Sequence, residues 1–176
     1  MTVLALRVVK MLLCVGPEGT GKTLLLRRLA NLNKPDISLT TVPTVGLNIA
    51  TIPREAEFPS INIRELGGSM APIWPSYYTG VKKVLYVVDA VNLTQLGEAT
   101  ILLMDLLAHP KLRAAQVAIV FNKTDSAMSR GVNELLHVMR FDNLKEYVPQ
   151  QLTTFEVSAL AGKGLRSLLK WITGEK

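Results

Sequence analysis

Cysteine is almost absent from this chain of 176 residues, in which Cys14 stands alone. One cysteine cannot close an internal disulfide, so the sequence is not that of a small disulfide-bonded secreted domain. Cys14 lies inside an apolar run, where a buried thiol acting as a small hydrophobic side chain is expected. Charged residues are also scarce, at 19%, while 48% are hydrophobic. This composition and length predict one domain, residues 1–176, with a large buried core.

Long apolar segments and lipid-attachment signals are missing as well. The apolar stretch from Val3 to Val15 is interrupted by Arg7 and Lys10, and it is shorter than the roughly 20 residues that cross a bilayer. Residue 2 is threonine instead of the glycine that N-myristoylation requires, and the last four residues contain no cysteine for prenylation. The sequence therefore predicts a cytoplasmic protein without a direct lipid anchor.

The net charge of +6 comes from 20 basic and 14 acidic residues. Proteins that bind nucleic acid usually concentrate their basic side chains on one face or along one helix. Here the basic residues are scattered, and the pairs Arg27-Arg28 and Lys82-Lys83 are the largest groups. No nucleic-acid partner is expected, and a weak attraction to an acidic partner or to anionic lipid is equally compatible with the charge.

Short β-branched runs alternate with longer helical patterns along the chain, an order typical of βαβ units. Two of the runs are joined by a polar turn and predict a hairpin, which adds one antiparallel strand to the sheet. The predicted fold class is α/β: one doubly wound domain whose six-stranded, mostly parallel sheet has helices on both faces. Strands are predicted at residues 7–15, 47–52, 61–66, 84–88, 117–121 and 155–158, and helices at 22–33, 94–108, 133–140 and 164–172. Residues 72–79 are predicted to form a short helix or turn.

A glycine-rich loop, Gly16-Pro-Glu-Gly-Thr-Gly-Lys-Thr23, connects the first predicted strand to the first helix. It matches the P-loop pattern G-x-x-x-x-G-K-[ST], in which backbone N–H groups at a helix N-terminus surround phosphate groups. Lys22 adds a positive charge for the β- and γ-phosphates, and the Thr23 hydroxyl is placed to ligate Mg²⁺. The loop predicts a P-loop NTPase. Its predicted nucleotide-binding residues are Gly16, Glu18, Gly19, Thr20, Gly21, Lys22 and Thr23.

A second motif, Asn122-Lys-Thr-Asp125, follows a predicted buried strand, at the sheet edge where open α/β folds bind ligands. Asp125 can accept hydrogen bonds from the N1–H and N2 amino group of guanine, a donor pair that adenine lacks. The stem of Lys123 can cover the ring, and Asn122 can either contact the base or tie this loop to the phosphate loop. Ser158-Ala159 can offer backbone N–H groups to the guanine O6. The motif favours guanine and disfavours ATP-using kinases.

Two segments between these motifs complete the predicted site. Thr44 stands on a polar loop, from which its hydroxyl can reach Mg²⁺ and the γ-phosphate. In Glu65-Leu-Gly-Gly68, the N–H of Gly68 can contact the γ-phosphate, although a glycine pair also suits an ordinary turn. The predicted ligands are GTP or GDP with Mg²⁺, and the predicted metal-binding residues are Thr23, Thr44 and Glu65.

With these motifs the chain resembles the Ras-like small GTPases, and among them the Arf-like branch, named after the ADP-ribosylation factors. The resemblance implies a G domain that binds Mg-GTP and Mg-GDP and recruits an effector in the GTP state. An exchange factor, an activating protein, a monomeric state and a role in vesicle or ciliary traffic are also implied, with a partner bringing the protein to membranes or the cilium. The branch-specific segments are Pro43–Asn48, Gly67-Gly68, Pro72–Tyr78, Val87–Ala90 and Gly164–Trp171.

Three departures from the family pattern concern catalysis. Glu65 replaces the usual aspartate: it keeps a carboxylate for a water on Mg²⁺ but is one methylene longer, so weaker metal binding is expected. Ser69 replaces the glutamine that orients the attacking water. Three residues separate Gly68 from Pro72, where the Arf pattern has five. With Lys22, Gly68 and Ser69 as the predicted catalytic residues, GTP hydrolysis is expected to be very slow.

The predicted effector surface departs from the family as well. Arf-like proteins commonly present three aromatic side chains to their partners, and the matching positions here are Leu47, Arg64 and Tyr77. Because one aromatic residue remains, the partners of ordinary Arf proteins are not expected to bind. Two functions stay open: a switch that hydrolyses GTP slowly with help from an activating protein, and a GTP-binding adaptor that hardly cycles and serves as a protein-interaction module.

Overall fold

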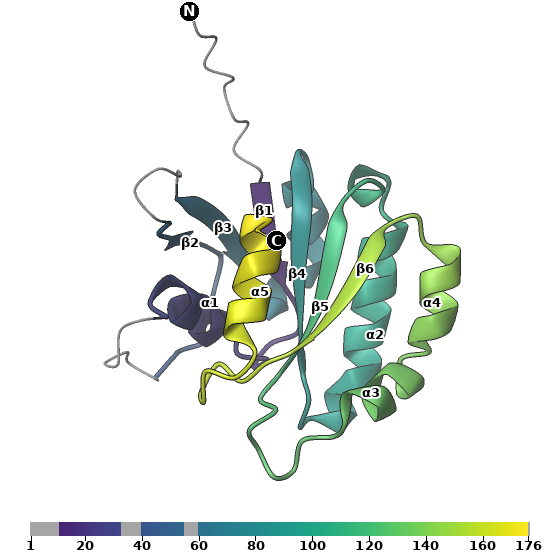
Figure 1. Cartoon of the computed structure of the whole chain (residues 1–176). Helices are drawn as coiled ribbons and strands as arrows, with labels where there is room; N and C mark the ends of the chain where they lie inside the picture. Colours follow the sequence, from purple (N-terminus) through teal and green to yellow (C-terminus); the bar gives the residue numbers. More distant parts are fainter. Residues whose placement is uncertain (1–10, 33–39, 55–59, 176) are drawn as a thin grey trace, which may run out of the picture.

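A six-stranded sheet with the strand order β2-β3-β1-β4-β5-β6 forms the centre of the molecule (Figure 1). The structure, a computed structural model, describes residues 11–32, 40–54 and 60–175. β2 is antiparallel to β3, and the other neighbouring strands are parallel. The predicted α/β fold class, with one antiparallel strand contributed by the hairpin, is confirmed. The strands are β1 (Met11–Val15), β2 (Leu47–Ile52), β3 (Ile61–Leu66), β4 (Val81–Asp89), β5 (Gln116–Asn122) and β6 (Gln151–Glu156).

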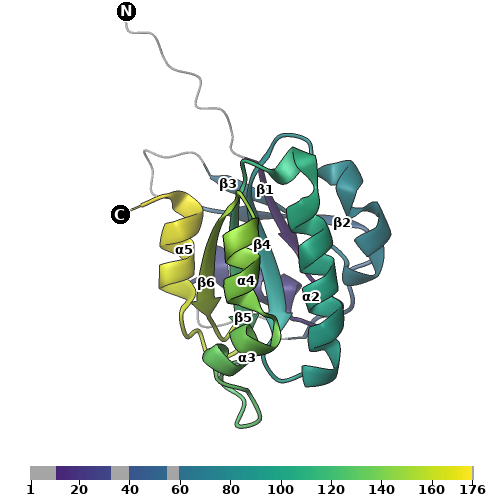
Figure 2. The same ribbon diagram turned by 90° about the vertical axis from the view of Figure 1, so that its right-hand side faces the viewer.

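Helices cover both faces of this sheet, so its central strands are buried on both sides (Figure 2). Successive side chains of a strand point to opposite faces: Leu13 belongs to the core under α2, and Leu12 and Cys14 belong to the core under α1 and α5. Burial raises the pKa of the Cys14 thiol, as expected for a small hydrophobic side chain. The helices are α1 (Lys22–Ala30), η1 (Gly68–Tyr77), α2 (Leu93–Ala108), η2 (Pro110–Leu112), α3 (Val132–Val138), α4 (Phe141–Tyr147) and α5 (Leu165–Thr173).

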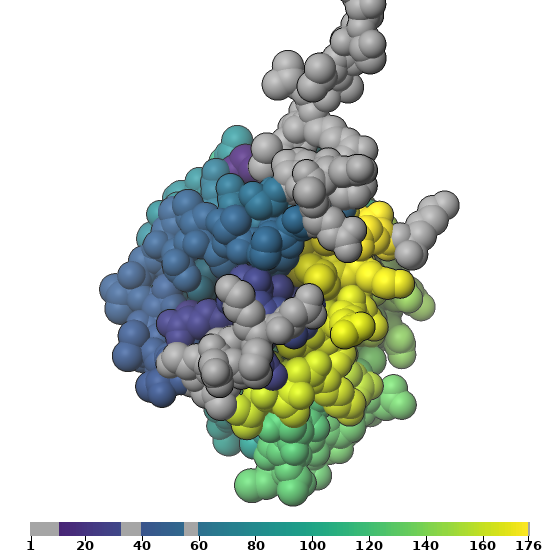
Figure 3. Space-filling view, turned by 60° about the vertical axis from the view of Figure 1, so that its left-hand side comes forward, coloured from purple at the N-terminus to yellow at the C-terminus, as the bar shows by residue number. Residues whose placement is uncertain are grey.

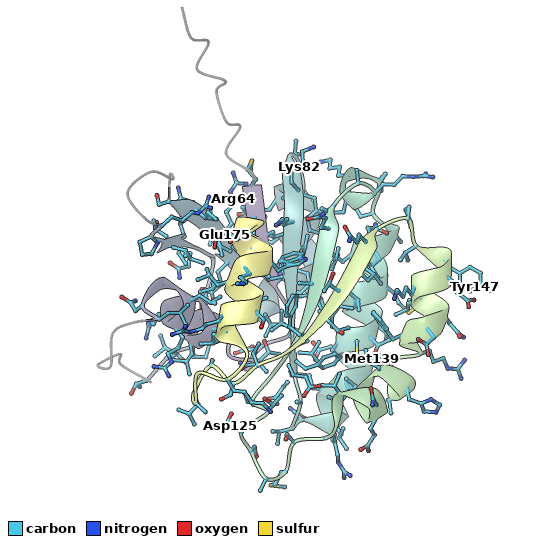
Figure 4. All side chains as sticks on the ribbon, in the orientation of Figure 1. Arg64, Lys82, Asp125, Met139, Tyr147 and Glu175 are labelled. Carbon is cyan, nitrogen blue, oxygen red and sulfur yellow. The ribbon has the colours of Figure 1, made fainter. Side chains whose placement is uncertain are left out.

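Two strands differ from their predicted bounds by more than one residue at an end. β4 begins at Val81 and includes the lysine pair, because Nζ of Lys83 donates hydrogen bonds to the carbonyls of Trp171 and Ile172 at the end of α5. Lys82, by contrast, is exposed at the start of the strand (Figure 4). The strand predicted at 155–158 is placed too late in the chain, because β6 covers 151–156. As an edge strand with β5 as its one neighbour, β6 tolerates polar residues that read as a loop.

The helix predicted at 133–140 corresponds to α3, which ends at Val138, and a second short helix, α4, follows it that was not predicted. The break falls at Arg140, whose φ of 50° is left-handed, and no glycine or proline marks it in the sequence. The first helix ends at Ala30, three residues before the predicted end, and Asn33 lies outside the described residues together with 7–10 of the first predicted strand. Within the described ranges, no helix is long and apolar enough to cross a membrane.

Candidate functional site

Most of the predicted site residues lie at or just after the carboxyl ends of β1, β3, β5 and β6, at one end of the sheet, and Thr44 lies in the segment that precedes β2 (Figure 1). This is the edge at which open α/β sheets bind ligands. Residues as far apart in sequence as Thr20 and Asn122 are in contact there. A cavity of about 210 Å³ opens between the glycine-rich loop, residues 41–44 and residues 65–68.

The glycine-rich loop requires glycine at two positions for steric reasons. A Cβ on Gly16, whose φ is 146°, would lie 2.2 Å from the carbonyl oxygen of Val87. A Cβ on Gly21, whose φ is 86°, would lie 2.6 Å from Nδ2 of Asn122. Both positions combine a left-handed backbone with close contact, which L side chains avoid. These glycines let the loop pack against β4 and β5, as the resemblance implies for a phosphate-binding loop.

Lys22 lies inside this loop, and its Nζ donates hydrogen bonds to the carbonyl oxygens of Gly16 at 2.8 Å and Pro17 at 2.7 Å. Burial lowers the pKa of Lys22, and the nearby charges of Glu65 and Glu18 act in the opposite direction by favouring its charged form. The ammonium is thus held beside the cavity that Lys22 lines, where anionic oxygens of a ligand can approach it.

Asn122 connects the two loops that the sequence assigns to phosphate and base. Its Nδ2 donates to the carbonyl of Thr20 at 2.9 Å, and its Oδ1 accepts from the backbone N–H of Ala159 at 3.0 Å. Both ends of the buried amide are therefore occupied by protein groups. Of the two roles left open for Asn122, the structure shows the tie between loops.

Asp125 and Lys123 extend from the same loop. Oδ1 of Asp125 accepts a hydrogen bond of 2.6 Å from the buried hydroxyl of Ser158, while the Asp125 residue itself is exposed. Lys123 has a φ of 67°, uncommon for a residue with a Cβ. Its Nζ lies 2.6 Å from Oδ2 of Asp89, which caps the end of β4 by accepting from the backbone N–H of Val91. These contacts fix the direction of both side chains.

Two residues that the sequence did not indicate also brace these loops. The guanidinium of Arg28, on α1, donates to the carbonyls of Ala159 at 2.9 Å and Leu160 at 3.2 Å. Gln95, at the start of α2, donates from Nε2 to the carbonyl of Glu18 at 3.0 Å. Neither residue belongs to a motif. Their partners are backbone carbonyls of distant segments, and such contacts leave no pattern in the sequence.

The three predicted metal-binding residues are brought together at the edge of the cavity. The hydroxyl oxygens of Thr23 and Thr44 are 2.9 Å apart. Both hydroxyls also contact Oε1 of Glu65, at 3.2 Å in the case of Thr44. The second carboxylate oxygen, Oε2, accepts a hydrogen bond of 3.0 Å from Nδ2 of Asn48. Hydroxyl and carboxylate oxygens are ligands that Mg²⁺ prefers, so the donor set fits this ion.

The double glycine lies between the phosphate loop and the loop that carries Thr44. A Cβ on Gly67 would lie 2.0 Å from the carbonyl oxygen of Thr44, and a Cβ on Gly68 would lie 2.2 Å from the backbone nitrogen of Glu18. The buried Trp74 donates from its indole N–H to the carbonyl of Gly67 at 3.1 Å. Ser69 follows as an exposed residue in the first turn of η1.

The predicted effector residues lie on the hairpin and on η1. Leu47 and Arg64 share one face of the hairpin, because both alternate with the Asn48–Glu65 pair, which lies on the other face. Ile49, opposite Arg64 in the strand register, is 57% exposed and was not indicated by the sequence. Tyr77 is partly buried against the core on the same side of the sheet. β2 forms an outer edge of the molecule (Figure 3), and Arg64 lies well away from Asp125 (Figure 4).

A family model described as the ADP-ribosylation factor family matches residues 2–175 of the chain. The chain belongs to this family. It is similar to human ADP-ribosylation factor-like protein 16, at 39% identity over 168 residues that cover 92% of this chain and 84% of the relative. The ADP-ribosylation factor-like protein 1 of Drosophila melanogaster is 30% identical over 165 residues, which cover 92% and 86%. The Arf-like resemblance of the motifs is thereby confirmed.

The same architecture occurs in the solved structure of the Arl6 BBS3 small GTPase from Trypanosoma brucei with bound GppNp. The TM-score is 0.79 at 20% sequence identity, with 94% of this chain and 96% of that one covered. This likeness shows the fold of a small GTPase. Membership of the ADP-ribosylation factor family implies a GTP-binding switch, and the roles of individual residues follow from the site itself.

Proposed function

We propose that this Arf-like protein binds GTP and GDP at the described site and recruits an effector in the GTP state. The carrying observation is the bond network of Asn122, which joins the phosphate loop at Thr20 to the loop of Ala159. It places Asp125, held by Ser158, on the same side as the phosphate loop. A purine recognised by Asp125 can then extend its phosphates toward Lys22.

In this proposal each residue has one task. Backbone N–H groups of the loop 16–21 bind the phosphates, and Lys22 leaves its carbonyl partners to contact the β- and γ-phosphate oxygens. Thr23, Thr44 and Glu65 hold Mg²⁺, which neutralises part of the negative charge on the phosphates. The N–H of Gly68 contacts the γ-phosphate.

The hydrolysis step is the weak part of the machinery. Ser69 ends in a short hydroxyl and lies in the first turn of η1, whose start is fixed by the bonds that Trp74 and Met70 make to Gly67. We expect slow hydrolysis, because the hydroxyl at position 69 is too short to orient a water in the way that the usual glutamine does. The same observation favours the second candidate function, a GTP-binding adaptor that remains in one nucleotide state.

The proposed effector surface comprises Leu47, Ile49, Arg64 and Tyr77. Two exposed aliphatic side chains beside one arginine and one aromatic ring form a surface of mixed character, unlike a triad of aromatic residues. Arginine and tyrosine are among the residues enriched where proteins bind one another. By family analogy the effector acts in membrane or ciliary traffic and brings the monomeric, cytoplasmic protein to its membrane.

Competition binding tests the proposed function directly. The purified protein, freed of nucleotide, is loaded with a fluorescent GDP and displaced by GTP, GDP or ATP in the presence of Mg²⁺. GTP and GDP are expected to displace the probe at concentrations at least about a hundredfold below ATP, because ATP lacks the donor pair that Asp125 binds. Equal displacement by ATP and GTP would refute guanine specificity, and no binding of any nucleotide would refute the site.

Replacing Gly68 with alanine is expected to weaken binding of the γ-phosphate. The added Cβ would lie 2.2 Å from the backbone nitrogen of Glu18, so the N–H of residue 68 must move away from its proposed contact. We expect the ratio of affinities for a non-hydrolysable GTP analogue and for GDP to fall about tenfold, the value of one hydrogen bond to a charged group. The control is Gly97→Ala, where nothing lies within 4 Å of the new Cβ; an unchanged ratio in Gly68→Ala contradicts the contact.

A further inference from the structure

We infer that Glu65 ligates the metal ion directly through Oε1, with Asn48 as the residue that positions its carboxylate. The inference rests on the proposed function, since it concerns the ion that accompanies the nucleotide. It differs from the role that the family resemblance implies, in which a shorter carboxylate binds a water on the ion. Glu65 thus becomes a third protein ligand beside Thr23 and Thr44.

The oxygen atoms around Glu65 have too few hydrogens for all of their contacts. Three oxygen atoms, from Thr23, Thr44 and Glu65, are in mutual contact. Each of these three contacts needs its own hydrogen if it is a hydrogen bond, but two hydroxyls supply only two and an ionised carboxylate supplies none. One contact between the oxygens is therefore left without a hydrogen. A cation shared by all three oxygens removes this deficit, because each oxygen then donates a lone pair to it.

The distances between the oxygens of Thr23, Thr44 and Glu65 can be compared with those in a magnesium site. In an octahedral Mg²⁺ site with bonds of 2.0–2.1 Å, neighbouring ligand oxygens lie about 2.9 Å apart. The hydroxyl oxygens of Thr23 and Thr44 are 2.9 Å apart, and Oε1 of Glu65 is 3.2 Å from that of Thr44. Two sides of this triangle therefore match an edge of such an octahedron, and the third, between Thr23 and Glu65, is shorter. The three residues line the same cavity as the phosphate loop.

The carboxylate of Glu65 is buried without a cationic side chain bonded to it among the residues that the structure describes. Glu65 is fully buried, and in the described part of the chain no salt bridge is formed by it. Lys22, which lines the same cavity, donates its hydrogen bonds to carbonyls of the phosphate loop. A buried carboxylate with neutral donors alone is costly, and a metal ion bound to it offsets that cost.

Asn48 determines which carboxylate oxygen is available. It lies opposite Glu65 in the register of β2 and β3 and donates from Nδ2 to Oε2 at 3.0 Å. With Oε2 engaged, Oε1 is directed to the two threonine hydroxyls. Hydrogen bonds of this kind, from a neighbour to a metal-binding carboxylate, commonly change metal affinity by about 10- to 100-fold.

Counting the water ligands of the ion tests the inference. Mn²⁺ replaces Mg²⁺ with a non-hydrolysable GTP analogue, and the broadening of the Mn²⁺ electron paramagnetic resonance lines in ¹⁷O-enriched water gives the number of bound waters. Two phosphate oxygens, two threonines and Glu65 fill five of six positions, so one water is expected. Two waters would overturn the inference. Glu65→Asp is expected to show one water more than the wild type, and an equal count in both would likewise overturn it.

The role of Asn48 is tested by the Mn²⁺ affinity of the same complexes. Asn48→Ala is expected to weaken Mn²⁺ binding about tenfold. The matched control is Asn62→Ala, which removes a cross-strand bond to Thr51 on the exposed part of the same hairpin and is expected to leave the affinity within about twofold. Equal affinities in both variants would remove Asn48 from the inference. Nucleotide binding is measured first: its absence refutes the proposed function, whereas normal binding with two waters refutes direct ligation alone.

Discussion

Replacing Asp125 with asparagine is expected to lower the affinity for GTP at least about a hundredfold and to create affinity for xanthosine triphosphate. The carboxylate accepts two charge-assisted hydrogen bonds from guanine in the proposed complex, each worth about 1.5–3 kcal/mol. An asparagine amide cannot accept both, but it can donate to the oxygen that xanthine carries at C2. Competition binding with the two triphosphates measures the change.

The control for this substitution is Asp142→Asn, which makes the same chemical change at an exposed residue of α4. Its affinity for GTP is expected to equal that of the wild type. Because Ser158 bonds to Asp125 at 2.6 Å, thermal unfolding of both variants should be compared to exclude a general loss of structure. An Asp125→Asn protein that binds GTP normally would show that another residue reads the base.

Single-turnover hydrolysis is expected to proceed at or below about 10⁻⁴ s⁻¹ in the wild type, the scale of unassisted Ras-type enzymes. Ser69→Gln alone is expected to raise the rate less than about threefold, because the loop to Pro72 is two residues shorter than the Arf pattern and the glutamine starts from the wrong backbone position. Inserting two residues between Met70 and Pro72 together with Ser69→Gln is expected to give at least about a tenfold increase.

Four proteins decide the matter: the wild type, each single change and the combination. Ser76→Gln serves as a control, because it introduces the same side chain at another exposed position of η1. Full rescue by Ser69→Gln alone would contradict the argument from loop length. So would a wild-type rate equal to that of an ordinary Arf-like enzyme with its activating protein.

The sequence predicted those parts of the molecule that depend on local rules. The glycine-rich loop needs glycine at 16 and 21, because both have a left-handed backbone and no room for a Cβ. Such local requirements are visible in the sequence as a motif. The hairpin at 47–52 and 61–66 followed from alternation and a polar turn, and its bounds agree with β2 and β3. The mostly parallel sheet with one antiparallel strand was predicted as well, whereas the order of its strands was not.

What the sequence did not reveal depends on contacts between distant segments. The bonds of Arg28 to the carbonyls of 159 and 160 join α1 to a loop more than a hundred residues away. The helix break at Arg140 carries no glycine or proline. The pairing of Asn48 with Glu65 became visible only when the strand register was known. It supports a direct metal-binding role for Glu65 in place of a role through water.

The position of Trp74 has a practical consequence for following this protein in solution. Its indole N–H bonds to the carbonyl of Gly67, beside the glycine proposed to contact the γ-phosphate. Trp171, the other tryptophan, lies on α5 under the ammonium of Lys83, 4.7 Å from its ring centre. A movement of Gly67 on exchange of nucleotide changes the surroundings of one indole and leaves the other as a constant background. We therefore expect the fluorescence of Trp74 to report the nucleotide state of the protein.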